Sequence, residues 1–246
     1  MRTLIVTSSI TFVPENYDQM ICSMASHPSV VGLLILENRS ISLLIKAFAL
    51  IITFSAPRLG LTMIKNYFGN SLQRRKSAYK IANKKTWILP DINSTEALEL
   101  LKNEKIDLIV NSRTRSIFKK QILNQPSLGC INIHHGLLPD QRGLMCDFWA
   151  HLEGQDFGFS IHQMTSKIDD GPILHVEKIA GNKNSYMESI WLASQKEAQV
   201  TKIILDQISN DGSFKAIINN SSSSILYRKN PSLIDGYRMQ RKGVKL

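Results

Sequence analysis

Two polar side chains at the end of a short apolar run, Asn132 and His134, are the best placed in this chain to do chemistry. Residues two apart in a strand project to the same face, so both point one way while Ile131 and Ile133 point the other. Gly136 follows, as expected where a chain turns out of a strand. A neutral amide beside an imidazole can hold a carbonyl oxygen and move a proton. In isolation such a pair is more often a structural hydrogen-bonded pair than a catalytic one, and a second motif in the right order favours catalysis.

A second polar motif lies downstream, where a strand-like Gly158-Phe-Ser-Ile-His162 is followed by Asp169-Asp170-Gly171. A carboxylate close to an imidazole orients it and favours its charged form. Composition alone does not distinguish the two aspartates, and in isolation the segment would be an ordinary turn. For His162 we expect a buried, hydrogen-bonded position in the sheet.

The order and spacing of these motifs resemble the signature of the folate-dependent formyltransferases, most closely from Trp87 to Ile179. The matching elements are Asn132-Ile-His134, Leu137-Leu-Pro139, Arg142-Gly143, Gly158-x-Ser-x-His162 and Asp169-x-Gly171, with His135-Gly136 where Pro-Ser is usual.

By that resemblance, Asn132, His134 and Asp169 form the catalytic trio, and the alignment selects Asp169 over Asp170. The implied formyl donor is 10-formyltetrahydrofolate. Attack of an amine on its formyl group passes through a tetrahedral centre, which requires oxyanion stabilisation and proton transfer between two nitrogens. Asn132 and His134 would face the oxygen, and Asp169 would orient the imidazole, with a water as a relay.

The resemblance also implies a pterin-binding loop after the strand at 107–110, lined by Arg115, Ser116 and Ile117, with Asp169 contributing to the same site. The alternative is a basic strand-to-helix turn in which Ser116 begins a helix running toward Leu123. The Gly-rich loops that bind dinucleotides or ATP are absent from the sequence, and the histidines lack the spacing of a zinc site. No metal is predicted.

Apolar runs alternate with helical patterns along the chain. Strands are expected at 2–8, 30–36, 107–110 and 130–134, and helices at 14–27 and from an N-cap at Ser94 to residue 101. This alternation predicts an α/β fold with a doubly wound, open, mostly parallel sheet, like the Rossmann-like formyltransferase fold.

The 246 residues suit one catalytic domain, which we place at 1–206, followed by an extension at 207–246 that begins a helical hook after Pro231. The formyltransferases that act on initiator methionyl-tRNA carry a further β-barrel domain, and about forty residues from Gln207 are too few to form it. Residues 40–85 have no counterpart in the family pattern and are predicted to be an insertion.

That insertion is both basic and apolar. Residues 41–85 hold nine Lys or Arg and no acidic residue, out of a net charge of +10, and residues 226–246 hold six against one. Such clusters attract phosphates or form a solvated face. The apolar run at 41–54 is too short to span a bilayer and is compatible with a buried helix, a homodimer contact or a helix lying on a membrane surface.

The three cysteines show no metal-ligand spacing and no secretory signal is visible, which predicts reduced thiols in a cytoplasmic protein. We assign Cys146, near the motif, to packing. Peripheral contact with a membrane through 41–85 stays open.

These observations predict formyl transfer from 10-formyltetrahydrofolate to a primary amine of a small phosphorylated acceptor, with a nucleotide-linked amino sugar preferred and nucleic acid not expected. The alternatives are hydrolysis of the formyl folate, a methionyl-tRNA formyltransferase-like enzyme, and a non-catalytic RNA-binding or membrane-surface protein on the same fold. A glycinamide ribonucleotide acceptor is disfavoured, because Thr7-Ser-Ser9 stands in place of a Gly-rich phosphate loop.

Overall fold

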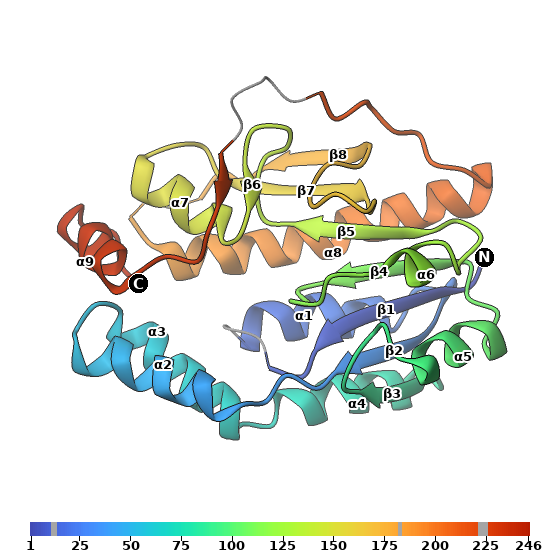
Figure 1. Ribbon diagram of the computed structural model, residues 1–246, viewed down its shortest axis with the longest axis horizontal. Coiled ribbons are helices and arrows are strands. Elements are labelled where there is room, and N and C mark those ends of the chain that lie inside the picture. The colour runs from blue at the N-terminus through green and yellow to red at the C-terminus, as the bar shows by residue number, and fades with distance from the viewer. Residues whose placement is uncertain (11–13, 182–183, 221–225) are drawn as a thin grey trace.

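The computed structural model describes residues 1–10, 14–181, 184–220 and 226–246. Within them, a sheet of seven strands has the order β3-β2-β1-β4-β5-β7-β8 (Figure 1). The first five strands in sequence are parallel, and β7 and β8 are antiparallel additions at one edge. The strands are β1 Thr3–Ser8, β2 Val30–Leu36, β3 Lys85–Leu89, β4 Leu108–Ser112, β5 Cys130–His134, β7 Gly158–Gln163 and β8 Ile173–Lys178.

Helices cover both faces of the sheet, as expected for parallel strands that are buried on both sides. One face packs against α1 (Pro14–Met24), α4 (Ser71–Ile81) and the long α8 (Tyr186–Asp211), and the other against α5 (Thr95–Asn103) and α6 (Lys120–Leu123). Alternate residues of β1 serve the two layers: Ile5 enters the first, and Leu4 and Val6 the second. The predicted doubly wound, mostly parallel sheet is confirmed.

The site predicted from the sequence lies where the strand order of this sheet reverses, between β1 and β4. β1 pairs with β2 on one side and with β4 on the other, so the connections leave in opposite directions at the carboxyl ends of β1 and β4. A crevice opens outside the strands at such a switch point. β4 ends at Asn111–Ser112 and β5 at Asn132–His134, which brings their polar ends side by side.

The predicted insertion forms α4 and, before it, two helices, α2 (Ile41–Ile52) and α3 (Pro57–Phe68), which pack together as a hairpin at one end of the molecule (Figure 1). Gly60 lets them approach closely, since a Cβ there would lie 2.5 Å from the Ala47 carbonyl oxygen. Ala47, Leu59 and Met63 join an apolar cluster with α7 (Cys146–Glu153) and α9 (Leu233–Arg241). The outer face of α2 remains exposed, so this helix is not a core helix.

The C-terminal part of the chain packs back on the loops of the sheet. Helix α8 continues through residue 206, the expected domain boundary, and ends at Gly212. Beyond it, Ile217 pairs with Ile173, and β9 (Tyr227–Arg228) pairs with β6 (Arg142–Gly143) in a second, two-stranded sheet. Helix α9 is the hook expected after Pro231, and Ser232 and Asp235 close its N-terminus as a capping box.

Two local predictions have different outcomes. Ser94 caps α5 as expected, because its hydroxyl accepts from the backbone N–H of Ala97. The alternative in which a helix begins at Ser116 is wrong: residues 114–119 form a loop, and α6 begins only at Lys120. Without that helix, the backbone of the loop is available to line the crevice.

The β6–β9 contact gives a stability test. Gly143 has φ +98°, and a Cβ at this position would collide with the backbone of Arg228. We expect Gly143→Ala to lower the free energy of unfolding by about 2–4 kcal/mol, since a positive φ and a backbone clash add. Urea denaturation measures the change. Gly154→Ala is the matched control, because its φ is +71° with nothing within 4 Å of the added Cβ, and it should cost only about 1 kcal/mol. Equal losses would contradict the clash.

Candidate active site

A cavity of about 610 Å³ opens at the carboxyl ends of β4 and β5. Its walls come from the loop after β4, the end of β5, the segment between β7 and β8, and residues 227–230. A volume of this size falls within the range of small-molecule and cofactor sites. Every site residue predicted from the sequence lines it: Asn132, His134, Asp169, Arg115, Ser116 and Ile117.

The imidazole of His134 lies between a carbonyl and a carboxylate. Its Nε2 is 2.7 Å from the backbone oxygen of Gln141, and its Nδ1 is 3.4 Å from Oδ1 of Asp169. A carbonyl oxygen only accepts, so Nε2 carries a hydrogen. A second proton on Nδ1 would then be shared with the carboxylate, which makes Asp169 the group that stabilises an imidazolium here. His134 is 6 % exposed and Asp169 7 %, so little solvent screens the pair.

Asp169 is held by contacts from three directions. Its φ of +52° lies in the left-handed region, which Asp tolerates better than most residues. Its Oδ2 accepts from the Gly143 N–H at 2.9 Å, so Oδ1 faces His134. The side-chain amide of Asn219 donates to the backbone oxygens of Asp169 and Gly171. The loop is therefore pinned at both its backbone and its carboxylate.

Asp170, the competitor for this role, faces another group. Its Oδ1 lies 2.5 Å from Nη1 of the buried Arg142, and this hydrogen bond lowers the pKa of the carboxyl. Arg142 also donates to Oδ1 of Asn219 and to the Tyr227 hydroxyl. Asp170 thus helps to anchor the loop, and Asp169 is the aspartate that reaches the imidazole.

Asn132 belongs to a chain of hydrogen bonds whose directions are all fixed. Thr114 donates to Oδ1 of Asn111, and Nδ2 of Asn111 donates to Oδ1 of Asn132 at 2.8 Å. Nδ2 of Asn132 lies 3.1 Å from Nε2 of His162, whose Nδ1 contacts the Gln163 backbone oxygen at 2.9 Å. Because that oxygen only accepts, Nδ1 is protonated and Nε2 accepts from Asn132. The amide orientation of Asn132 is thereby set.

This orientation matters because Asn132 also lines the cavity. One of its two amide N–H groups donates to His162, and within the described residues the other makes no hydrogen bond. The sequence indicated Asn132, but not Asn111 or Thr114, which continue its hydrogen-bond chain. A polar residue at the end of the adjacent strand β4 was the only available signal.

His162 is buried and hydrogen-bonded in the sheet, as predicted. Burial lowers its pKa from 6.5 to about 4, and the neighbouring His134 acts in the same direction. Its Nε2 is also 3.7 Å from Oδ1 of Asp169. A neutral His162 is what the bond from Asn132 requires, so the low pKa and the hydrogen-bond geometry agree.

A second ionic cluster, which sequence reasoning missed, lies beside the first and contains Arg113, His135, Asp147 and Glu197. Glu197 Oε1 is 2.9 Å from both Arg113 Nη2 and His135 Nε2, and His135 Nδ1 is 3.6 Å from Asp147. Burial raises the pKa of Glu197 to about 7 and also raises that of Asp147. The one signal in the sequence was His135 itself, a histidine where proline is usual.

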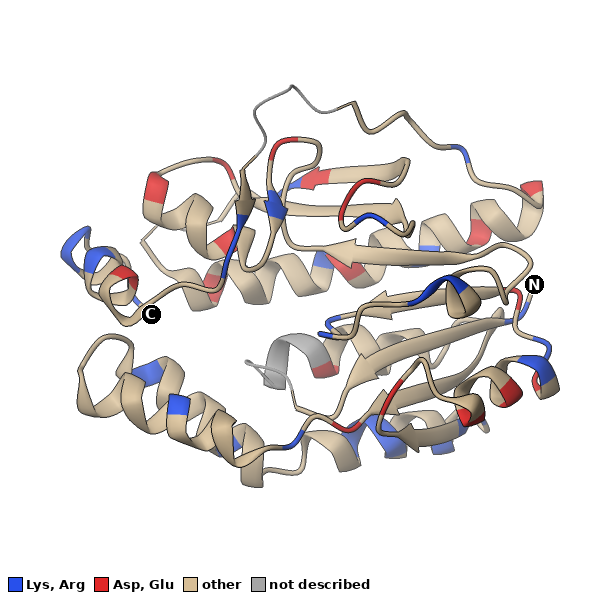
Figure 2. Ribbon diagram, in the orientation of Figure 1, with Lys and Arg blue, Asp and Glu red and all other residues tan. Residues whose placement is uncertain are grey.

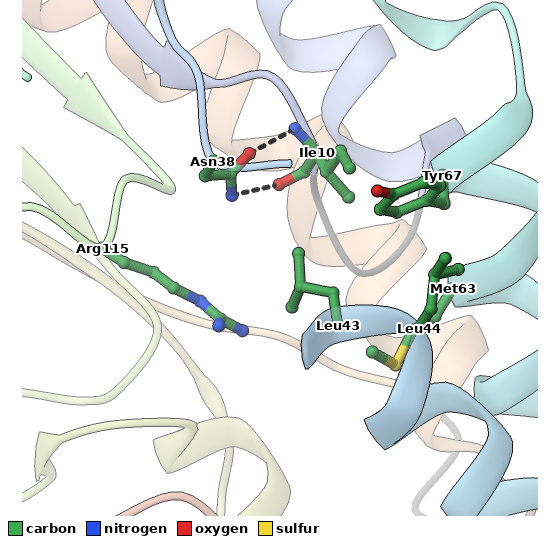
Figure 3. Close-up of a pocket in the computed structure, with 7 residues that line it drawn as sticks. All are labelled: Ile10, Asn38, Leu43, Leu44, Met63, Tyr67 and Arg115. Atoms are coloured by element: carbon green, nitrogen blue, oxygen red, sulfur yellow. Dashed lines mark hydrogen bonds between the residues drawn. The ribbon is translucent and has the colours of Figure 1, made fainter. Parts of the chain in front are cut away.

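The loop after β4 forms the opposite wall. Arg115, Ser116 and Ile117 line the large cavity, and Arg115 also borders a smaller pocket with Ile10, Asn38 and the α2–α3 hairpin (Figure 3). In that pocket the Asn38 side chain makes two hydrogen bonds to the backbone of Ile10, and these hold Ile10 in place two residues after the end of β1. The predicted loop residues therefore lie where a bound molecule would contact them.

Cys146 is a buried residue at the start of α7, in agreement with its assignment to packing. Burial raises the pKa of its thiol well above the usual range, and the nearby Asp147 and Asp169 act in the same direction. A protonated, buried thiol is a poor nucleophile. Among the residues that the structure describes, no group of three His, Cys, Asp or Glu side chains is arranged to hold a metal.

The low pKa of His162 predicts a pH-dependent stability. Protonation begins near pH 6.5 in the unfolded chain but near pH 4 in the folded one, so acid favours the unfolded state between these values. Stability present above pH 6.5 should be lost as the pH falls through 4, by up to roughly 3 kcal/mol. Denaturant unfolding between pH 7 and 4 measures it. His162→Gln should reduce the slope, whereas His175→Gln, a partly exposed histidine on β8, should keep it; an unchanged slope in His162→Gln would contradict this origin.

Known proteins match both the sequence and the fold. A methionyl-tRNA formyltransferase of Blochmanniella floridana is 41 % identical over 106 residues, which are 42 % of this chain and 32 % of that protein. The match thus spans about a third of the relative's length. A glycinamide ribonucleotide transformylase 1 of Symbiobacterium toebii has a TM-score of 0.60 at 15 % identity, covering 89 % of this chain and 94 % of the other.

A sugar N-formyltransferase of Shewanella sp FDAARGOS_354 has a TM-score of 0.59 at 16 % identity, covering 98 % of this chain and 87 % of the other. These structural likenesses establish the shared fold. The formyl transferase family model matches residues 65–205, more than half of the chain and all of the segment from β3 to β8. The chain therefore belongs to the formyl transferase family.

Proposed function

We propose that this protein transfers a formyl group from 10-formyltetrahydrofolate to the primary amine of a small phosphorylated acceptor, with a nucleotide-linked amino sugar as the preferred class. The family uses this formyl donor. The observation that carries the proposal is the convergence of an amide, an imidazole and a carboxylate, from Asn132, His134 and Asp169, around one cavity.

The residues of the cavity fit such a donor. The cavity volume suits a folate-sized ligand, and the loop from Arg115 to Ile117 forms one wall while residues 164–169 line another part. Arg115, Ser116 and Ile117 would hold the pterin, with Asp169 at its reactive end. When bound, the donor supplies a formyl carbonyl whose carbon accepts the amine.

Each member of the trio then has a defined task. The second N–H of Asn132 donates to the formyl oxygen as negative charge develops on it, and its fixed direction avoids reorientation during the reaction. His134, whose Nδ1 faces Asp169, would add positive charge beside that oxygen when it carries a proton on both nitrogens. Asp169 stabilises this imidazolium and, through a water, relays the proton lost by the attacking nitrogen to the nitrogen that leaves.

The charge of the lining supports a phosphorylated acceptor. Five basic residues border the cavity, Arg113, Arg115, Lys167, Arg228 and Lys229, against the two carboxylates of Asp147 and Asp169. Arg113 and Arg228 are paired with Glu197 and Glu153 behind the lining, so Arg115, Lys167 and Lys229 are the cations that would attract phosphate groups. The fold relatives are named for glycinamide ribonucleotide and for sugars, and the sequence relative is named for methionyl-tRNA. A basic lining is compatible with all three kinds of acceptor. The preference for a nucleotide-linked amino sugar comes from the sequence analysis.

The trio is tested by substitution. We expect His134→Ala and Asp169→Asn each to reduce formyl transfer by a factor of roughly a hundred or more, since each removes a group that moves or stabilises a proton. The assay incubates the protein with the formyl donor and a panel of amines, comprising nucleotide-linked amino sugars, glycinamide ribonucleotide and methionyl-tRNA. Product is detected as the mass gain of one CO, and formate release reports hydrolysis.

Asp170→Asn is the matched control. It removes the neighbouring carboxylate, which contacts Arg142 and not the imidazole, and should cost less than about tenfold. Near-normal transfer by both His134→Ala and Asp169→Asn would end the assignment of the trio. Formate release without transfer to any amine would favour the hydrolase.

The hydrogen-bond chain gives a second test. Asn111→Asp is nearly isosteric but places a carboxylate against Oδ1 of Asn132, which forces that amide to turn and lose its donor. We expect kcat to fall about tenfold or more with a smaller change in KM, because the donor acts mainly on developing charge. Asn111→Ser, which keeps a hydroxyl donor, should retain more activity. If both variants lose the same amount of kcat, the orientation of Asn132 does not depend on Asn111.

A further inference from the structure

The α2–α3 hairpin presents a continuous apolar stripe to solvent. Ile41, Ile45, Phe48 and Ile52 of α2 are 74, 64, 51 and 72 % exposed. At 100° per residue these four side chains fall within an arc of about 60°, so they form one line along the helix. Phe54, two residues beyond the end of α2, is exposed too, as are Leu61 and Phe68 of α3. Scattered exposed apolar residues are normal, but a contiguous stripe marks a surface that something covers.

The stripe lies in the most basic part of the chain. Residues 41–85 carry nine Lys or Arg and no Asp or Glu. Figure 2 shows the two helices of the hairpin with Lys and Arg bands alone, whereas α5 and α8 carry both signs. Lys46 is exposed on α2, and Arg58 and Lys65 on α3. Of the nine cations, Arg74, Arg75 and Lys85 pair with Asp18 or Glu104 from outside the segment, and Lys46 and Arg58 remain as exposed cations of the hairpin.

Other residues of the hairpin line the cavities. Leu43 and Leu44 of α2 line the smaller pocket with Met63 and Tyr67 of α3 (Figure 3), and Leu59 lines the large cavity. The four side chains of the stripe line neither cavity, so the stripe is not part of the ligand site. The hairpin thus separates the site from an outward surface that the transfer reaction does not use.

We propose that this surface docks on an anionic phospholipid bilayer, with Ile41, Ile45, Phe48 and Ile52 in the boundary between headgroups and acyl chains and the cations on the headgroups. The combination of an apolar line with the exposed cations Lys46 and Arg58 on short helices matches an interfacial helix. In the described residues no helix has the length and apolar character needed to cross a bilayer, so contact would be along the surface.

The charge argues for a membrane over a second copy of the chain. A twofold contact through this face would bring the cations of two hairpins together, and residues 41–85 supply no carboxylate to compensate. An anionic lipid surface carries the opposite charge, so it attracts each Lys or Arg that comes close to it. The stripe also matches what a bilayer accepts, since burying each Ile or Phe removes a large apolar area from water.

The test is co-sedimentation of the full chain with phosphatidylcholine vesicles and with vesicles of phosphatidylcholine and phosphatidylglycerol. We expect binding to the anionic vesicles, at least about tenfold weaker binding to the neutral ones, and weakening of the anionic binding as salt rises. Phe48→Ser with Ile52→Ser should reduce anionic binding by about tenfold or more. Lys46→Glu with Arg58→Glu should do the same without touching the stripe.

Trp191→Ser with Ile203→Ser is the matched control, since it removes one aromatic and one isoleucine from the exposed side of α8. It should leave vesicle binding unchanged. Formyl transfer to a soluble amine, together with the unfolding midpoint, checks that the Phe48 and Ile52 variant is folded. Binding is read independently of transfer, so failure of the proposed reaction would not affect this test.

Three results would overturn the proposal. The first is absence of binding to anionic vesicles by the unmodified chain. The second is equal binding by the stripe, charge and control variants. The third is a dimer, measured by sedimentation in solution without lipid, that the Phe48 and Ile52 substitutions dissociate, because a second copy would then be the occupant.

Discussion

The site depends on keeping a carboxylate next to imidazoles in a place where little water reaches it. Removing a charge from water is costly unless it is paired and hydrogen-bonded, and Asp169 meets that condition with a backbone N–H from Gly143 on one oxygen and His134 on the other. This arrangement requires a backbone conformation with positive φ at Asp169, which is sparsely populated. Arg142 and Asn219, which lie outside the reacting groups, hold it in place. Much of the C-terminal segment can be understood as support for this one turn.

A second constraint is direction. An amide can be rotated by half a turn at little cost in space, so a catalytic asparagine is useful only if its neighbours distinguish oxygen from nitrogen. Here the backbone carbonyl of Gln163 at one end fixes every donor in the chain, and the Thr114 hydroxyl at the other end, which can donate or accept, follows that direction. The neutral state of His162 is part of the same device, because a protonated ring would have no lone pair for Asn132. The burial of His162, its lowered pKa and the orientation of the Asn132 amide therefore depend on one another.

The strands and the pair Asn132 and His134 could be predicted from the sequence because they are local, whereas Asp169 was selected over Asp170 by the family resemblance. Apolar runs mark β1, β2, β4 and β5, and the period of two places Asn132 and His134 on one face. The contributions of Asn111 and Asn219 could not be predicted, since each depends on a partner in a distant segment. The alternative of a helix beginning at Ser116 was wrong. A serine that could cap a helix does not show that a helix begins there, and α6 begins four residues later, at Lys120. For residues 41–54 the pattern allowed three environments, and only packing against α3 showed which side is exposed.

The pairing of β9 with β6 has a consequence for how the chain acquires its active form. Arg142 and Tyr227 are 85 positions apart, and the intervening residues include β7, β8 and the whole of α8. The strands of the sheet all precede the segment that supplies Asn219 and Tyr227, so that segment is synthesised after them. Closing so long a loop is slow compared with local folding. A correctly shaped turn at Asp169 therefore requires a contact that assembly of the sheet does not by itself provide.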